Sequence, residues 1–201
     1  MTETTSLSRI DDAALNTLFR HARTAKNFAP DPIPDADLHA IYDLVKMGPT
    51  SMNLQSLRVV YVQSAEQKAR LSEHLSEANR AKAASAPVNA ILAADTDFHE
   101  TLHITTPHFP GAKDSFADES RRETMARGQA WLAAGYFIMA VRALGYAAGP
   151  MGGFKAAALD SDFFAGSSWR SICVVNIGKP GPDAWQDRAP RLDFDYAARI
   201  V

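Results

Sequence analysis

One long apolar stretch sets the tightest limit on what this chain can fold into. Residues from about Asp118 to Leu144 predict a single helix closed by Gly145, and the middle of this helix, AWLAAGYFIMAVRAL, is apolar nearly all round. Such a helix has to be covered on every face, which a single small domain can hardly do. We therefore expect part of it to be buried against a second subunit, in a homodimer.

The rest of the chain predicts helices and strands in alternation. Helix-capping aspartates, apolar residues at helical spacing and β-branched runs mark the boundaries. The expected elements are helices over about 11–21, 35–47, 65–75 and 155–159, and strands over about 57–64, 87–95 and 169–180. Residues 96–116 show no sustained period and suggest a mobile excursion beside a site, and residues 181–201 are expected to be extended. The order favours an α+β fold with a mixed sheet over a doubly wound one.

Length and charge limit the class of protein. The 201 residues fit one domain, 11–201, preceded by a flexible arm, 1–10. A net charge of −2 and a pI of about 6.3 leave no overall field that would attract nucleic acid or an anionic membrane. The first residues lack the layout of a signal peptide, and no apolar run approaches the roughly 18 residues of a membrane span. We expect a cytoplasmic enzyme, with the single Cys173 as a buried structural thiol.

Two short polar segments carry the side chains expected to bind a ligand. In RTAKNF, the residues Arg23, Thr24 and Lys26 place two cations and a hydroxyl close together, which suits a phosphate group. The later segment GPTSMNLQSLR exposes small and amide side chains, which suit the hydrogen-bonding edge of a planar ring. Taken singly, cations at a helix end also complement the helix dipole, and polar loops are common. Together the two segments favour a flavin mononucleotide, FMN, which is anionic at one end and planar at the other.

Two further motifs bear on the chemistry. The glycines of GPMGGF would let backbone approach a planar ring closely, although a tight turn before a strand explains them more simply. His99, Glu100 and His103 match the HExxH string of zinc proteases. Thr105-Thr106-Pro107 would break the helix that zinc chemistry requires, so we expect no metal there and keep zinc hydrolysis as an alternative. A bound cofactor supplies redox chemistry most simply.

The order of these motifs resembles the FMN-dependent nitroreductase family. RTAKNF, GPTSMNLQSLR, GPMGGF and a late RAPRL occur in the family's order between about residues 12 and 200. Within the family, the chain is most similar to the branch that contains malonic semialdehyde reductase, the 3-hydroxypropanoate dehydrogenase of bacterial pyrimidine utilisation. The resemblance implies an α+β homodimer with a mostly antiparallel sheet, a long dimer-interface helix and two FMN sites at the subunit interface.

The resemblance also implies which residues contact the cofactor. Arg23, Thr24 and Arg191, together with Arg188, would hold the phosphate, and Lys26 would lie near N1 and O2 of the flavin. Contacts with the ribityl chain and the ring are implied for Ser51, Asn53, Gln55, Asn79, Pro150, Met151, Gly152 and Gly153.

Two departures from the family pattern bear on the substrate. Gly152 replaces the glutamate of the common PxEG motif, and Ala22 replaces the first arginine of the usual Arg-Arg-Ser start. We predict that NADPH or NADH donates hydride and that a small carbonyl compound, 3-oxopropanoate, accepts it. The alternatives are a broad nitroreductase or quinone reductase on the same flavin, and a flavin-binding module without turnover. An acidic substrate would need a cation near the ring, for which the candidates are Arg58, Arg121, Arg122 and Arg127.

Overall fold

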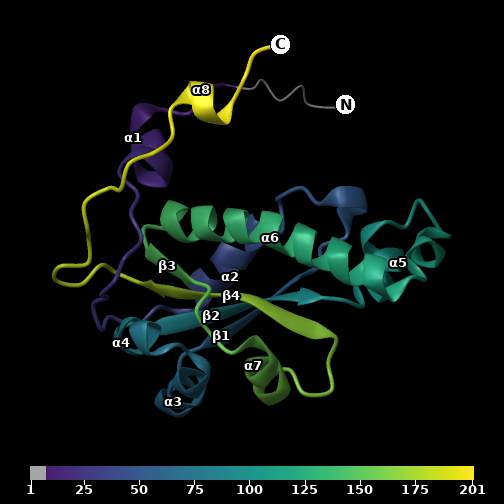
Figure 1. The fold of residues 1–201 in the computed structure, drawn as a ribbon, viewed down its shortest axis with the longest axis horizontal. Helices are drawn as coiled ribbons and strands as arrows, with labels where there is room; N and C mark the ends of the chain where they lie inside the picture. Colours follow the sequence, from purple (N-terminus) through teal and green to yellow (C-terminus); the bar gives the residue numbers. More distant parts are fainter. Residues whose placement is uncertain (1–7) are drawn as a thin grey trace.

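A four-stranded sheet forms the centre of the molecule (Figure 1). The computed structural model describes residues 8–201, so most of the predicted arm 1–10 lies outside the described residues. The strands are β1 (Leu57–Val62), β2 (Val88–Asp95), β3 (Ala147–Met151) and β4 (Trp169–Gly178). They lie in the order β1-β2-β4-β3, and all three pairings are antiparallel. The predicted α+β class and mostly antiparallel sheet are therefore confirmed.

Helices cover both faces of the sheet (Figure 1). One face packs against α2 (Asp35–Val45) and α6 (Glu119–Ala143), and the other against α3 (Ala65–His74), α4 (Glu77–Ser85) and α7 (Ala156–Phe163). Strand β2 shows why two layers are needed. Leu92 and Ala94 lie in the core beneath α6, whereas Ile91 and Ala93 lie in the core on the opposite face. Alternate side chains of a strand point to opposite faces, so a wholly apolar strand has to be covered twice.

The long helix α6 agrees closely with the predicted helix 118–144. Asp118 caps it by accepting a hydrogen bond from the Arg121 amide at 2.7 Å, and Gly145, with φ +79°, follows its end. Alanines and Phe137 form its buried side, whereas Trp131 and Leu132 remain about half exposed, at 52% and 46%. This chain therefore covers only one side of α6, as its all-round apolar sequence predicted.

Two helical segments differ from the sequence prediction. Helix α4 (Glu77–Ser85) was missed, because its alanines favour a helix strongly but do not repeat at a clear apolar period. The segment 96–116 contains two 3₁₀ helices, η3 (Phe98–Thr101) and η4 (Ala112–Phe116), and the short helix α5 (Leu102–Thr105). Their buried apolar side chains pack together, with the Phe98 and Phe116 rings 5.0 Å apart, so this segment is folded rather than irregular.

GPMGGF does not form a tight turn before a strand, because its first half lies within β3 itself. Pro150 faces Val175 of β4, and β3 is an edge strand, where a residue without an amide hydrogen is tolerated. Cys173 is buried in β4, where burial raises the pKa of its thiol, in agreement with a structural role. Among the described helices, none combines the length and the apolar composition needed to cross a membrane.

The two ends of the described chain leave the body at the same corner (Figure 1). The N-terminal segment comprises α1 (Asp12–Leu15) and a π-helical turn, Asn16–Arg20, and the C-terminal segment carries α8 (Phe194–Ala197). A β-bridge between Phe28 and Pro180 joins the two segments where they meet the sheet. Residues close to opposite ends of the sequence are thereby brought together.

Candidate functional site

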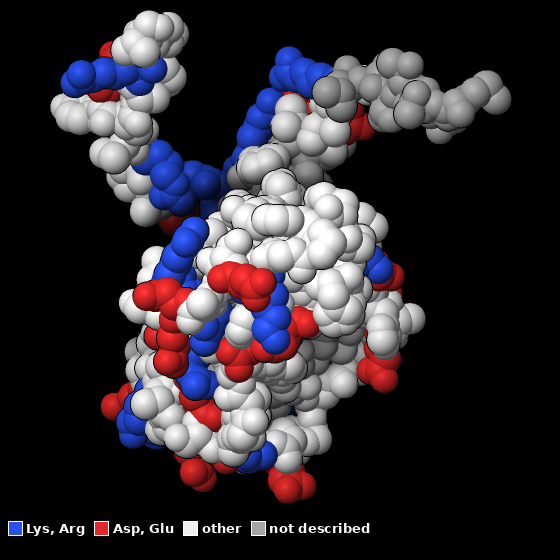
Figure 2. All heavy atoms as spheres, turned by 90° about the vertical axis from the view of Figure 1, so that its right-hand side faces the viewer, with Lys and Arg blue, Asp and Glu red and all other residues white. Residues whose placement is uncertain are grey.

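A hollow of about 370 Å³ lies where the two terminal segments meet. Arg23, Thr24 and Lys26 line it from the N-terminal side, and Arg188 and Arg191 line it from the C-terminal side. We call it the arginine hollow. Figure 2 shows Lys and Arg side chains gathered at the base of the projecting segments. The four side chains expected to hold a phosphate and Lys26, which was expected near the flavin ring, therefore share one hollow.

The arginines of this hollow are held by backbone carbonyl groups and not by acids. Arg23 donates to the Arg20 and Ala22 carbonyl oxygens at 3.3 and 3.1 Å, and Arg188 donates to the same two oxygens at 2.7 and 2.8 Å. Partial burial and the charges of Arg23 and Arg191 lower the pKa of Arg188. Guanidinium groups that repel one another in this way are stabilised by an anion placed between them.

Lys26 and its neighbours lie along strand β3. The Ala25 amide donates to the Ala148 carbonyl oxygen at 3.3 Å, and the Lys26 amide donates to the Ala184 carbonyl oxygen at 3.0 Å. The Lys26 ammonium group donates to the Gln186 amide oxygen. A Cβ atom on Gly149 would lie 2.9 Å from the Ala25 carbonyl oxygen, so this close contact requires a glycine.

The second half of GPMGGF lies against the start of α4. Asn79 donates from its side-chain amide to the Gly153 carbonyl oxygen at 3.1 Å, and the Ser76 amide donates to the same oxygen at 2.9 Å. Gly152 and Gly153 are exposed, whereas the Met151 side chain is buried in the core between α3 and α7. The Met151 side chain is therefore not available to a ligand.

The third predicted group lies in a strained loop. Met52, Asn53 and Gln55 have φ values of 48°, 54° and 44°, a backbone region that residues other than glycine rarely adopt. Residues in such regions cost about 1–3 kcal/mol each and cluster at functional sites. We call residues 51–55 the left-handed loop. It contains the short 3₁₀ helix η2 (Ser51–Asn53).

Neighbouring elements hold the left-handed loop in place. The Ser51 amide donates to the Gln129 side-chain oxygen on α6 at 2.7 Å. The Asn53 side chain donates to the Thr105 carbonyl oxygen at 2.7 Å, and the Thr106 hydroxyl group donates to the Met52 carbonyl oxygen at 2.9 Å. None of the loop's side chains lines the arginine hollow. Within one chain, the structure therefore does not bring these two groups together.

The HExxH string does not form a metal site. Its first half lies in η3 and its second half in α5, and the Glu100 carboxylate is paired with Lys113 at 2.6 Å. This lysine is the main cause that lowers the pKa of Glu100. The His103 Nδ1 atom lies 2.9 Å from the Glu100 carbonyl oxygen. In residues 8–201, no group of three or more His, Cys, Asp or Glu side chains is arranged to hold a metal ion.

Three of the four arginines considered as substrate contacts are engaged elsewhere. Arg58 is paired with Asp95 at 2.6 Å, and Arg127 is paired with a glutamate one helical turn before it at 2.9 Å. Arg122 donates to two backbone carbonyl groups at 2.9 Å. The exposed Arg121 makes no ion pair within residues 8–201, and its guanidinium lies 5.9 Å from the centre of a phenylalanine ring.

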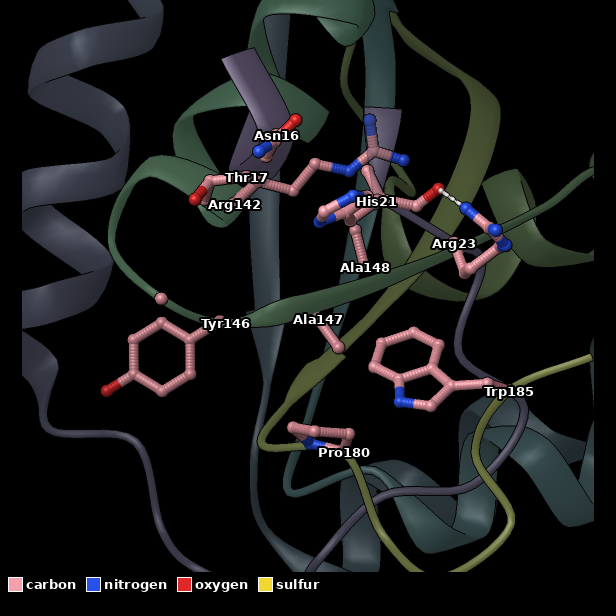
Figure 3. A pocket seen from close by; sticks show the side chains of 12 residues that line it. Asn16, Thr17, His21, Arg23, Arg142, Tyr146, Ala147, Ala148, Pro180 and Trp185 are labelled. Atoms are coloured by element: carbon pink, nitrogen blue, oxygen red, sulfur yellow. Dashed lines mark hydrogen bonds between the residues drawn. The ribbon is translucent and has the colours of Figure 1, made fainter. Parts of the chain in front are cut away.

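A second hollow, of about 240 Å³, adjoins the arginine hollow (Figure 3). Trp185 projects into it opposite Ala147 and Pro180, and Arg142 of α6 runs along its upper side. We call it the Trp185 hollow. Sequence reasoning missed Trp185, Arg142 and the loop contact Gln129. A lone arginine within the apolar run AVRAL was the one available signal, since a charge in such a run needs a specific partner.

Comparisons with known proteins agree with this fold. The model of the Nitroreductase family matches residues 19–179. A Streptomyces griseus protein named "Putative NADH dehydrogenase/NAD(P)H nitroreductase" is 54% identical over 193 residues, which cover 96% of this chain and 98% of the relative. The chain therefore belongs to the nitroreductase family.

Solved structures share the fold at much lower identity. A Bacillus subtilis protein named "putative nitroreductase ydfN" superposes with a TM-score of 0.83 at 20% identity, and the match covers 95% of this chain and 100% of that one. An Exiguobacterium sibiricum protein named "putative nitroreductase in complex with FMN" has a TM-score of 0.80 at 18% identity, and the match covers 98% of this chain and 100% of that one. The nitroreductase fold expected from the order of the motifs is thereby confirmed.

Proposed function

We propose that this protein is an FMN-dependent oxidoreductase that takes hydride from NADPH or NADH. The observation that carries the proposal is the arginine hollow, where cations from both ends of the chain meet without acidic partners. The names of the S. griseus relative and the FMN complex of the E. sibiricum structure support the same cofactors. Metal-dependent hydrolysis has no comparable support.

Each group of predicted residues has a role in this proposal. Arg23, Thr24, Arg188 and Arg191 would bind the phosphate, and Lys26 would stabilise negative charge on the ring. Asn79 and the exposed backbone at Gly152–Gly153 would contact the ring, since these groups lie together. When bound, FMN would accept hydride from the coenzyme and pass it to the substrate. The protein positions the ring and excludes water.

The left-handed loop would complete the site from a second copy of the chain. In a single chain, Ser51, Asn53 and Gln55 do not line the arginine hollow, although their strained backbone marks a functional loop. The loop is bonded to Gln129 of α6, the same helix that leaves Trp131 and Leu132 exposed. A homodimer formed through α6 would bury these side chains and carry the loop to the partner's cofactor.

We propose a small carbonyl compound, 3-oxopropanoate, as the acceptor. The similarity of GPMGGF to the semialdehyde reductase branch supports this substrate, although three of the four candidate arginines, Arg58, Arg122 and Arg127, are engaged with other groups. A quinone or nitro compound is the second candidate. The exposed apolar side chains of Met52, Ile104 and Phe109, on and beside the left-handed loop and its contacts, favour it.

Cofactor uptake and an acceptor panel test the proposal. Purified protein should be yellow and should take up FMN in stoichiometric amounts, as followed by absorbance and calorimetry. It should then oxidise NADPH or NADH faster in the presence of an acceptor. Comparison of 3-oxopropanoate with menadione and nitrofurazone identifies the substrate class. Absence of FMN uptake would refute the proposed function, and turnover with menadione alone would refute only the carbonyl substrate.

A further inference from the structure

The arginine hollow carries more positive charge than one flavin phosphate needs. Its lining includes five cationic side chains and one carboxylate, a net charge of +4, namely Arg23, Lys26, Arg142, Arg188 and Arg191 with Asp187. A phosphate monoester carries about −1.5 to −2 charges at neutral pH. A positive charge of about +2 therefore remains after one such group has bound, and a second anionic group would be attracted to the hollow.

Arg142 is the cation that lies between the arginine hollow and the Trp185 hollow. It lines both hollows and donates to the Leu18 carbonyl oxygen at 3.0 Å. Burial lowers the pKa of its guanidinium group, and the charge of Arg188 lowers it further. No ion pair within residues 8–201 involves either arginine. The half-buried cation Arg142 thus lacks an anion, which a ligand can supply.

The Trp185 hollow has the surface chemistry of a site for a flat heterocycle. The Trp185 side chain is about half exposed, at 49%, and it stands opposite the small apolar surface of Ala147 and Pro180 (Figure 3). Asn16 and His21 supply hydrogen-bonding groups on another side. An exposed indole attracts a planar base by stacking, and the polar side chains can bond to its edge.

We propose that the Trp185 hollow binds the adenosine phosphate end of a dinucleotide, with its phosphate on Arg142, while the flavin phosphate lies on Arg23, Thr24, Arg188 and Arg191. This inference rests on the proposed function. Two sources share this chemistry: the nicotinamide coenzyme, and the adenylate half of FAD. In both molecules a phosphate group is joined to the adenine base through one ribose. Such a unit can place its base in the Trp185 hollow and its phosphate in the adjoining arginine hollow, since Arg142 lines both.

Calorimetry on the FMN-loaded protein tests the inference without turnover. We expect 2′,5′-ADP and 5′-AMP to bind without displacing FMN. Trp185→Ala should weaken this binding about tenfold, because base stacking is lost, and Trp185→Phe should restore most of it. Arg142→Met should weaken 2′,5′-ADP binding to a similar extent. The matched control is Arg170→Met, since Arg170 likewise donates to backbone carbonyl groups and has no ion pair within residues 8–201, but lies outside both hollows.

Two further measurements identify the source of the nucleotide. If it is the coenzyme, Trp185→Ala raises the KM for NADPH and leaves kcat and FMN affinity unchanged. If it is FAD, the cofactor-free protein binds FAD more tightly than FMN, and Trp185→Ala removes the difference. If the wild-type protein binds FMN but not 2′,5′-ADP, the inference is wrong and the proposed function still holds. The same conclusion follows if Trp185→Ala weakens FMN binding as much as it weakens 2′,5′-ADP binding. Failure of the wild-type protein to bind FMN would overturn the proposed function.

Discussion

Asp162 accepts hydrogen bonds from two basic side chains of α3. Its carboxylate oxygens lie 2.5 Å from Arg70 and 2.7 Å from His74, and the Arg70 guanidinium also lies 4.5 Å from the centre of the Phe163 ring. The bonds from Arg70 and then His74 lower the pKa of Asp162 from 3.8 to about 2. These three side chains join α3 to α7. In the sequence, α7 closely follows the exposed glycines Gly152 and Gly153 of the candidate site.

This shift predicts a pH dependence of stability. Because the pKa is lowered on folding, the stabilisation by Asp162 is complete above pH 3.8 and is lost as the pH falls towards 2. We expect Asp162→Asn to lower the free energy of unfolding at pH 7, and the difference from the wild type to shrink below pH 3.8. Urea unfolding across this range measures it. A difference that stays constant down to pH 2 would show that the carboxylate's charge is not involved.

Substitution of Arg191 tests the proposed contact between this side chain and the FMN phosphate. Its guanidinium bonds only to the carbonyl oxygens of Ala189 and Pro190, so its removal should leave the fold intact. Loss of a hydrogen bond to a charged group costs about 1.5–3 kcal/mol, so Arg191→Gln should weaken FMN binding about 10- to 100-fold. Fluorescence titration with FMN measures the change. Arg170→Gln is the matched control, and an equal loss in both variants would contradict the assignment.

At the scale of the element, the folded segment 96–116 supports the left-handed loop. The Thr106 hydroxyl group, which is almost fully buried, donates to the Met52 carbonyl oxygen, and the Thr105 carbonyl oxygen accepts from Asn53. The strained φ angles of this loop persist only if surrounding bonds fix them. The segment expected to be a mobile cover is therefore a support for the loop beside it.

Thr106→Val removes the hydrogen bond from the Thr106 hydroxyl group to the Met52 carbonyl oxygen and changes the shape of the side chain little. We expect a loss of about 1 kcal/mol in stability, because the Thr106 side chain no longer donates a hydrogen bond to the Met52 carbonyl oxygen. FMN affinity should fall as well, since the loop is no longer held. Thermal unfolding with and without FMN measures both effects, and Thr106→Ser should restore both. A variant that loses stability but keeps full FMN affinity would show that the loop does not contact the cofactor.

The elements differ in how far the sequence could predict them. Strands β1, β2 and β4 and helix α6 have long apolar or β-branched runs, so their positions were predicted to within a few residues. Helix α4 was missed because alanines carry no apolar period. The residue types of Arg23, Thr24 and Lys26 marked one side of the arginine hollow, and the family resemblance added Arg188 and Arg191 on the other side. The second hollow could not, because Trp185 and Arg142 meet only through tertiary packing.

At the scale of the whole molecule, we expect the uncovered face of α6 to form the interface of a homodimer. Trp131 and Leu132 are about half exposed, and Tyr136 packs over Gly48 with 41% of its surface exposed. Exposed apolar side chains in one patch mark an interface, and a symmetric dimer places the same patch of both copies in contact.

A charged residue introduced on the exposed face of α6 tests whether the protein forms a homodimer through this helix. We expect Trp131→Glu to convert the dimer to a monomer, because burial of an unpaired carboxylate at the interface is costly. FMN affinity should fall with it, since the left-handed loop of the second copy is lost. Light scattering and FMN titration measure these changes. Ala158→Glu on the exposed side of α7 is the control, and a wild-type protein that is already monomeric would contradict the prediction.

The arginine hollow is assembled from opposite ends of the sequence, with Arg23 near the start and Arg188 and Arg191 near the finish. During translation, Arg23 leaves the ribosome well before Arg188 and Arg191, which follow the last strand of the sheet. If these side chains hold the flavin phosphate as we propose, a nascent chain that ends before Arg188 lacks two of its cationic contacts. We expect such shortened chains to retain less flavin than chains that include both arginines.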